Sequence, residues 1–291
     1  MGLPGFEPGS RAPEAFKSLF SLNWLEIRDD FIKWLESRNY SKEYAKRIVS
    51  DLDRHVKVIA TPMDIVNLFR GLSPGQQHNL DRAVRAFLKF YELQGVSLEY
   101  LNMLRRAIPK EVEFVDLTIP SEDEIIASLK RLPKAPLKYQ GFYSLLLDSG
   151  LRITEAARLI NNFGQVKVEK VNGFFRCKLG YFRGCKTAYF AHFTEETLRL
   201  IKAVRFKIDG ATASHYFLKR GYVACKYLRK FSFNKMIELN IPESVADFIQ
   251  GRVPVRIGAK HYMALETQAS KYYPRYMEYI RKLKRKAGLI L

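Results

Sequence analysis

The sequence is poor in the residues that build disulfide frameworks and metal centres. It has three cysteines, Cys177, Cys185 and Cys225, and none of them forms a CxxC motif with another. Its five histidines also lack the spacing of metal ligands. We therefore expect neither a disulfide scaffold nor a zinc site, and we expect no cofactor.

Long apolar runs and acidic residues are also scarce. No apolar run is long enough to cross a bilayer and no signal peptide is evident, so a cytoplasmic protein without a membrane partner is expected. The sequence has only 30 Asp and Glu residues but 49 Lys and Arg residues, which gives a formal net charge of +19. This excess indicates a polyanionic partner and favours nucleic acid over a membrane surface.

The chain is long enough for two domains with separate cores. Residues 1–20 are rich in Gly and Pro and lack helical periodicity, which indicates a flexible leader. Residues 21–106 repeat apolar side chains at helical spacing and predict a bundle of four or five helices, the first over residues 24–37 and the fourth from about residue 77. Residues 107–120 lose this period and predict an extended linker. Residues 121–291 then form the second predicted domain.

The second domain combines helical and strand patterns. A capping-box sequence at Ser121 to Glu124 predicts its first helix. Alternating apolar runs at 166–171, 174–179 and 188–193, separated by Gly-containing turns, predict a small antiparallel sheet. The predicted fold class is therefore an α-helical bundle followed by a mixed α+β, mainly helical domain.

The helices predicted in the bundle carry cations on their exposed faces, where they are suited to grip a DNA backbone. These residues are Lys42, Lys46, Arg47, Arg82, Arg85 and Lys89.

The stretch from Ser149 to Glu155, Ser-Gly-Leu-Arg-Ile-Thr-Glu, places Arg152 at the start of a predicted helix. Backbone N–H groups and the helix dipole favour an anion there, and the planar guanidinium suits a phosphate. A salt-bridged surface turn is the alternative explanation for this motif taken alone.

Further basic residues and a tyrosine follow Arg152 along the chain. Lys186 lies beside a predicted hairpin turn, and Lys226 and Arg229 lie three residues apart on a helix. Arg252 follows Gly251 at a predicted helix end, and Tyr262 comes ten residues later.

In this order the residues resemble the catalytic signature of the tyrosine recombinases, over about residues 21 to 280. Two positions depart from the common pattern: Lys226 stands where most members have the histidine of His-x-x-Arg, and Arg252 stands where most have histidine or tryptophan. Both departures, with the segment Gly251 to Tyr279, are similar to archaeal fusellovirus-type integrases.

The resemblance implies a reaction in which the Tyr262 hydroxyl attacks a DNA phosphodiester and forms a 3′-phosphotyrosine ester. Arg152 and Arg229 would neutralise the charge that develops on the nonbridging oxygens. Lys186 would protonate the leaving 5′-oxygen, and Lys226 and Arg252 would add electrostatic stabilisation. No histidine occupies the usual place of the general base, and Lys226 is the favoured candidate for proton removal from Tyr262. The resemblance also implies double-stranded attachment sites and a homotetramer in the synaptic complex.

Some alternatives remain open on sequence alone. Four downstream tyrosines compete with Tyr262 for the nucleophile's role: Tyr272, Tyr273, Tyr276 and Tyr279. A host Xer-like chromosome-dimer resolvase, a non-catalytic DNA-binding regulator and a relaxing topoisomerase compete with a viral or plasmid integrase. The leader favours the integrase. Gly5-Phe-Glu-Pro8 can be encoded by GGG-TTC-GAA-CCC, which has the consensus of a tRNA T-arm. Integrases of the kind that this chain resembles have attachment sites that lie in their own genes and match a tRNA gene. Integration at a tRNA gene by an archaeal mobile element is therefore predicted.

Overall fold

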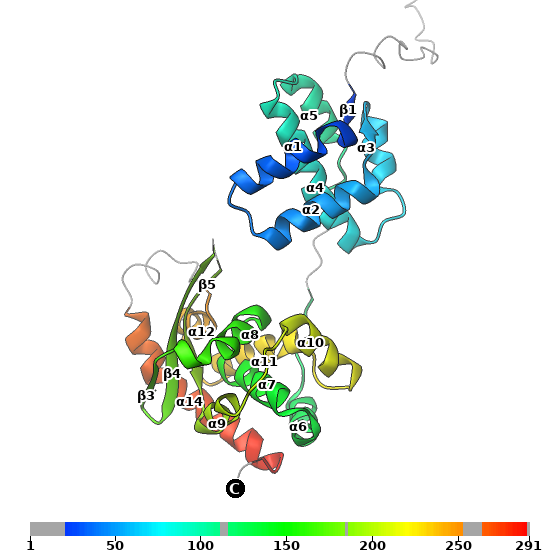
Figure 1. Cartoon of the computed structure of the whole chain (residues 1–291). Coiled ribbons are helices and arrows are strands. Elements are labelled where there is room, and N and C mark those ends of the chain that lie inside the picture. Colours follow the sequence, from blue (N-terminus) through cyan, green and yellow to red (C-terminus); the bar gives the residue numbers. More distant parts are fainter. Residues whose placement is uncertain (1–20, 111–115, 184–185, 253–263, 290–291) are drawn as a thin grey trace, which may run out of the picture. The chain divides into compact units, whose positions relative to one another are not determined.

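The computed structural model describes residues 21–110, 116–183, 186–252 and 264–289, and of residues 181–183, 186 and 187 it describes the backbone alone. The chain divides into two compact units, one ending at Val115 and the other beginning at Asp116 (Figure 1). The predicted leader 1–20 lies outside the described residues. Among the described residues, no helix is both long and apolar enough to cross a bilayer.

The described part of the first unit is a helical bundle with one very short pair of strands. Side-chain caps define several helix starts: Ser41 accepts from the N–H of Tyr44, and Thr61 forms a capping box with Asp64. The elements are β1 (Leu22–Asn23), α1 (Trp24–Ser37), α2 (Lys42–His55), β2 (Val58–Ile59), α3 (Pro62–Phe69), α4 (Pro74–Leu93) and α5 (Leu98–Arg106). Strands β1 and β2 pair antiparallel.

The core of this unit is aromatic. The Trp24 ring is fully buried and meets Phe31 and Phe87 edge-to-face, with centroids 5.3 and 6.0 Å apart. Its indole N–H donates to Asp53, so the one polar atom of the ring is satisfied. Because α1, α2 and α4 each contribute to this cluster, their outward faces remain available for other contacts.

The second unit is mainly helical, with a three-stranded sheet along one side of its helices (Figure 1). Its first half comprises α6 (Glu122–Arg131), η2 (Leu132–Lys134), α7 (Leu137–Ser149), α8 (Ile153–Asn161), η3 (Phe163–Gln165), β3 (Val168–Val171), β4 (Phe174–Arg183) and β5 (Lys186–Phe193). Its second half comprises α9 (Glu195–Lys202), α10 (Gly210–Lys219), α11 (Cys225–Glu238), α12 (Glu243–Ile249) and α14 (Leu265–Lys286). The predicted fold class is confirmed.

The sheet is antiparallel in the order β3-β4-β5, with Val168 opposite Cys177 and Phe175 opposite Phe193. The β4–β5 hairpin extends beyond the alternating runs that the sequence indicates, as far as the pair Arg183 and Lys186. An irregularity between Lys178 and Tyr181 interrupts the pairing, which explains why the alternation of apolar residues fades there.

Helix α7 is the centre of the second unit and is buried along most of its length. Helix α14 packs against it through two fully buried tyrosines: Tyr273 donates to the carbonyl of Asp148, and Tyr276 donates to that of Leu147. Lys284 of α14 is also buried and donates to the carboxylate of Asp148, 2.8 Å away. These bonds fix the C-terminal end of α7, from which the candidate site begins.

Candidate active site and nucleic-acid interface

Arg152 lies at a sharp turn between α7 and α8. Helix α7 ends at Gly150, which adopts a left-handed conformation with φ 61°, and Arg152 is the N-cap of α8. The Arg152 side chain does not extend freely from the helix end. Its Nη1 donates to Glu155 Oε1 at 2.7 Å and to the carbonyl of Gly251 at 2.8 Å. These two acceptors satisfy both hydrogens of Nη1.

Arg229 of α11 reaches the same place from the interior. Its Nη1 donates to the carbonyls of Gly150 and Gln250, both at 2.6 Å. Burial lowers the pKa of Arg229, and the nearby charges of Arg152 and Arg252 lower it further. Its Nη2 is buried and has no hydrogen-bond partner among the described residues.

This arrangement is costly without an anion. A buried cation needs a partner, and an unsatisfied N–H in the interior carries a desolvation penalty. A phosphate oxygen is a partner of the right charge and geometry for such a guanidinium.

Two buried polar residues, Gln250 and Ser232, hold Arg229 in place. The Nε2 of Gln250 donates to the carbonyl of Arg229 at 2.9 Å and to the hydroxyl of Ser232 at 2.6 Å. A Cβ added to Gly150 would lie 2.5 Å from Gln250 Nε2 and 2.6 Å from Ser232 Oγ. Only glycine therefore lets the α7–α8 turn approach the amide that supports Arg229.

Arg252 follows the C-terminal end of α12. Its Nη1 lies 3.4 Å from Asp247 Oδ1, and its guanidinium lies over the ring of Phe233, 4.9 Å from the centroid. Its backbone N–H donates to the carbonyl of Asp247 at 2.8 Å, which fixes the chain as it leaves the helix. Arg152 at the start of α8, Arg229 within α11 and Arg252 after α12 are thus brought together.

Lys226 lies one turn before Arg229 on α11, but its ammonium group has a different partner. Lys226 Nζ lies 3.2 Å from Asp116 Oδ2, and its side chain is 62% exposed. It also lies over the ring of Tyr227, 4.4 Å from the centroid. Lys226 and Arg229 share no acceptor among the described residues, although two cations three residues apart on a helix can converge on one phosphate.

Two of the candidate catalytic residues are only partly described or not described. The backbone of Lys186 pairs with Arg183 at the tip of the β4–β5 hairpin, and its side chain is not described. Tyr262 lies outside the described residues.

The rival tyrosines are placed by helix α14. Burial raises the pKa of Tyr273 and of Tyr276 well above the ordinary value, and both hydroxyls are held by backbone carbonyls. Tyr279 is half-buried and donates to the Glu122 carboxylate at 2.9 Å. Tyr272 is half-buried and its ring lies beneath Arg275, 4.8 Å away. Tyr273 and Tyr276 are therefore core residues, inaccessible to a DNA phosphate.

Cysteine and metal chemistry find no support in the described part of the chain. Burial raises the pKa of the Cys177 and Cys225 thiols to about 12, so neither is a ready nucleophile. The residues that the structure describes contain no cluster of three or more His, Cys, Asp or Glu able to hold a metal ion.

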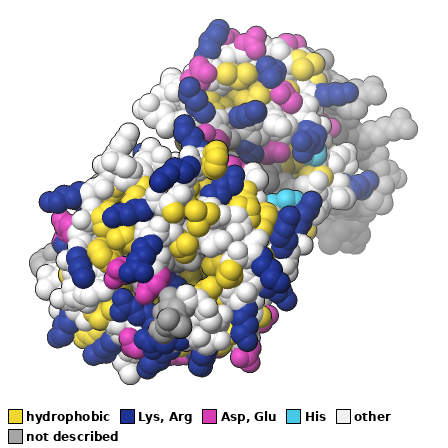
Figure 2. All heavy atoms as spheres, turned by 60° about the horizontal axis from the view of Figure 1, so that its bottom comes forward, with side chains coloured by type: hydrophobic (Ala, Val, Ile, Leu, Met, Phe, Trp, Pro, Cys, Tyr) yellow, Lys and Arg dark blue, Asp and Glu magenta, His cyan; other side chains and the backbone are white. Residues whose placement is uncertain are grey.

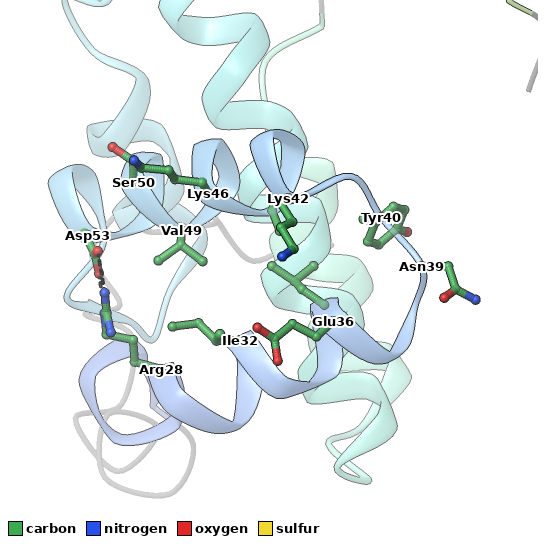
Figure 3. Close-up of a pocket in the computed structure, with 12 residues that line it drawn as sticks. Arg28, Ile32, Glu36, Asn39, Tyr40, Lys42, Lys46, Val49, Ser50 and Asp53 are labelled. Carbon is green, nitrogen blue, oxygen red and sulfur yellow. Dashed lines mark hydrogen bonds and ion pairs between the residues drawn. The ribbon is translucent and has the colours of Figure 1, made fainter. Parts of the chain in front are cut away.

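In the first unit, the six cations proposed for DNA contact are all exposed. Lys42 and Lys46 line a pocket of about 880 Å³ between α1 and α2 (Figure 3). Ile32 and Val49 point into it from opposite helices, and the ion pair between Arg28 and Asp53 closes one end (Figure 3).

A second pocket of about 290 Å³ is lined by residues of α1, α2 and α4 and is both basic and aromatic. The Arg82 guanidinium lies over Tyr44 at 5.2 Å, and that of Arg38 lies over Trp34 at 5.8 Å. The remaining lining residues include Tyr40, Arg85 and Lys89. Cations interleaved with aromatic rings suit a nucleic-acid surface. Figure 2 shows that Lys and Arg side chains are more frequent than Asp and Glu on the visible faces.

The sequence of the second unit matches a known protein family. A family described as archaeal phage integrase matches residues 117–279. The chain belongs to this family, and with it to the tyrosine recombinase superfamily. The match lies within the second unit of this integrase-family chain and includes all six candidate catalytic positions.

Solved structures show the same fold. A lambda integrase dimer bound to a COC′ core site matches this integrase-family chain with a TM-score of 0.60 and 15% identity, over 88% of this chain and 81% of that one. Lambda integrase residues 75–356 bound to DNA match with a TM-score of 0.59 and 14% identity, over 83% of this chain and 96% of that one. A lambda integrase tetramer bound to a Holliday junction gives 0.60 and 14%, over 84% and 82%. No curated protein sequence matches significantly.

Gln250, Ser232 and Asp116 are site residues that the sequence did not reveal. Gln250 and Ser232 act through contacts with Gly150 and Arg229, and Asp116 contacts Lys226 across 110 positions of the chain. No local pattern signals such contacts. Gly150 gave only a weak signal of the close approach by Gln250, because a glycine directly after a helix also serves as an ordinary C-cap.

Proposed function

We propose that the chain is a site-specific recombinase that cleaves and rejoins double-stranded DNA through a 3′-phosphotyrosine ester at Tyr262. The observation that carries this proposal is the buried guanidinium of Arg229, which faces Arg152 and Arg252 and has an unpartnered Nη2 among the described residues. A site that gathers cations in this way is arranged for an anion such as a phosphodiester.

In the proposed reaction, the Tyr262 oxygen bonds to phosphorus and the bond from phosphorus to the 5′-oxygen breaks. Arg152 and Arg229 stabilise the charge on the nonbridging oxygens, and Arg252 adds to the positive field. Lys186 delivers a proton to the leaving 5′-oxygen. The Lys226 ammonium assists removal of the proton from Tyr262 by stabilising the phenolate, and the proton passes to water. The ester conserves the energy of the broken bond, so a 5′-hydroxyl reverses the step on either strand.

The biological setting is part of the same proposal. We infer that the enzyme integrates a viral or plasmid genome of an archaeal mobile element at a tRNA gene, with a homotetramer joining two attachment sites. The T-arm-like coding potential of the leader supports the tRNA gene, and the lambda integrase tetramer on a Holliday junction supports the assembly by analogy. The nucleotide sequence around the gene tests the first point, since an overlapping tRNA gene is expected.

The decisive experiment uses a nicked suicide duplex, from which the cleaved fragment diffuses away and leaves a covalent protein–DNA adduct. The wild-type chain is expected to form the adduct, and Tyr262→Phe is expected to form none while binding DNA with nearly unchanged affinity. Tyr272→Phe is the matched control, because it removes one hydroxyl from α14 and leaves Tyr262 intact. DNA binding without an adduct from the wild-type chain would favour a non-catalytic regulator, and an adduct that persists in Tyr262→Phe would assign the nucleophile elsewhere.

A further inference from the structure

A carboxylate lies between two lysines of the candidate site. Oδ2 of Asp116 is 3.2 Å from Nζ of Lys226 and 3.3 Å from Nζ of Lys230, and Lys230 also donates to the backbone carbonyl of Asp116. The other carboxylate oxygen accepts from the N–H of Thr118 at 3.1 Å. One oxygen of Asp116 thus meets two ammonium groups, as a nonbridging phosphate oxygen would.

Asp116 is ionised under ordinary conditions. Hydrogen bonds from Thr118, followed by those from Lys226 and Lys230, hold the pKa of this carboxyl well below its usual range. Lys226 and Lys230 are one helical turn apart on α11, and both ammonium groups lie over the ring of Tyr227 between them. The lysines therefore form one anion-binding position, and Asp116 fills it.

The contact joins the start of the second unit to the helix that carries Arg229. Asp116 is the first residue of the second unit, directly after the division from the first. Lys226 precedes Arg229 by three residues on α11, so the two side chains leave the helix on neighbouring parts of one face. A segment that begins the second unit thus reaches a cation beside the buried arginines.

We propose that Asp116 is a positioning residue that occupies the phosphate place between Lys226 and Lys230 until DNA displaces it. This inference rests on the proposed function, in which Lys226 assists the attack of Tyr262 on the DNA phosphate. The carboxylate keeps Lys226 ordered beside the site and lowers the attraction of the two lysines for DNA. A phosphate competes for the same ammonium groups, and the release of Asp116 leaves Lys226 free to act on the substrate.

The contact is weak enough to be displaced. Lys226 is 62% exposed and Asp116 27% exposed, and ion pairs in such surroundings are screened by water and salt. Loss of the carboxylate is therefore expected to raise DNA affinity by about threefold to tenfold at low salt, within the range for exposed pairs when two lysines are released.

The test compares Asp116→Asn with wild type in the full chain, using fluorescence anisotropy on a short labelled duplex and the rate of adduct formation. Asp123→Asn is the charge-matched control, because Asp123 is exposed on α6 and lies outside this cluster. Asp116→Asn is expected to raise both affinity and adduct rate, Asp116→Glu to restore the lower affinity, and Asp123→Asn to leave both near wild type. Introduced into a Lys226→Met, Lys230→Met background, Asp116→Asn is expected to lose its effect on affinity.

The outcomes separate this inference from the function on which it rests. If Asp116→Asn binds DNA no more tightly than wild type, or gains affinity equally without the two lysines, the proposed role of Asp116 is wrong. If the gain in affinity depends on the lysines but neither wild type nor any variant forms an adduct, the role of Asp116 at the anion-binding position is supported. The proposed recombinase reaction is then wrong.

Discussion

Gly150 and Gln250 meet at the centre of the candidate active site, where a Cβ on Gly150 would lie 2.5 Å from Gln250 Nε2. The same two residues supply the carbonyls that accept from Arg229 Nη1. Their close approach joins the end of α7 to the end of α12 and fixes the guanidinium between them. The precision of the site therefore depends on the absence of one side chain.

Gly150→Ala is expected to lower the free energy of unfolding by about 1–3 kcal/mol, because alanine at φ 61° is strained and its methyl group collides with buried polar atoms. The adduct rate should fall as well, since Gln250 must move and Arg229 moves with it. Urea denaturation and the suicide-duplex assay measure the two effects. Gly164→Ala is the control, because its Cβ would meet no atom within 4 Å. Equal stability of the two variants would contradict this account of the turn.

Arg152→Ala and Arg229→Ala are each expected to reduce cleavage by roughly 10² or more, by analogy with the loss of an oxyanion-hole donor. DNA affinity should change much less, because many phosphate contacts share it. Arg199→Ala is the control, since that side chain is 74% exposed on α9. Adduct rate and equilibrium binding are measured in parallel, and a loss of binding as large as the loss of cleavage would make these arginines anchors rather than catalysts.

Lys284→Met is expected to lower the free energy of unfolding by about 3–5 kcal/mol, because it leaves the carboxylate of Asp148 buried without its cation. Thr194 and Thr197 also lose a donor. Lys286→Met, two residues along the same helix, removes only an exposed pair with Glu122 and should cost about 0–1 kcal/mol. Urea denaturation at neutral pH compares them, and similar losses would show that the buried cluster adds little to the stability of α14.

His192 is expected to make the second unit sensitive to acid. Burial among aromatic rings lowers its pKa to about 3, so it is neutral in the folded chain. The unfolded chain binds the proton from about pH 6.5, so the free energy of unfolding decreases as pH falls from there toward 3, by at most about 1.4 kcal/mol per pH unit from this group. His192→Phe should flatten this decrease. His215→Phe, at an exposed position, should leave it unchanged, and an identical pH profile for wild type and His192→Phe would exclude the effect.

Arg38→Ala and Arg82→Ala, both at the aromatic pocket of the first unit, test whether this surface grips DNA. Each is expected to make the dependence of log affinity on log salt shallower by up to about 0.9, the slope for one phosphate contact. Titrations at several salt concentrations measure the slope. Arg54→Ala is the control, because Arg54 lies in the last turn of α2 and does not line the pocket. Unchanged slopes in both pocket variants would place the DNA contacts of the bundle elsewhere.

Local sequence patterns determined the helices and strands of this protein. Apolar residues at helical spacing predicted α1 as residues 24–37, which the structure confirms, and the Gly-containing breaks predicted the hairpins. The start of α4 was predicted at about residue 77, and the helix begins at Pro74 because Ser73 and Gln76 form a capping box. Such features depend on neighbours a few residues apart, so the sequence contains the information directly.

The sequence also determined which residue types could serve a phosphate, and their order along the chain placed it among the recombinases. Only the tertiary structure decided how those residues meet. It turned Arg152 toward Gly251, set Arg229 against Gly150 and Gln250, and gave Lys226 the carboxylate of Asp116 as a partner. It also separated buried core residues such as Tyr273 from candidates for chemistry. These contacts join positions 21 to 125 residues apart, and they arise because packing of buried helices, rather than local periodicity, fixes which side chains become neighbours.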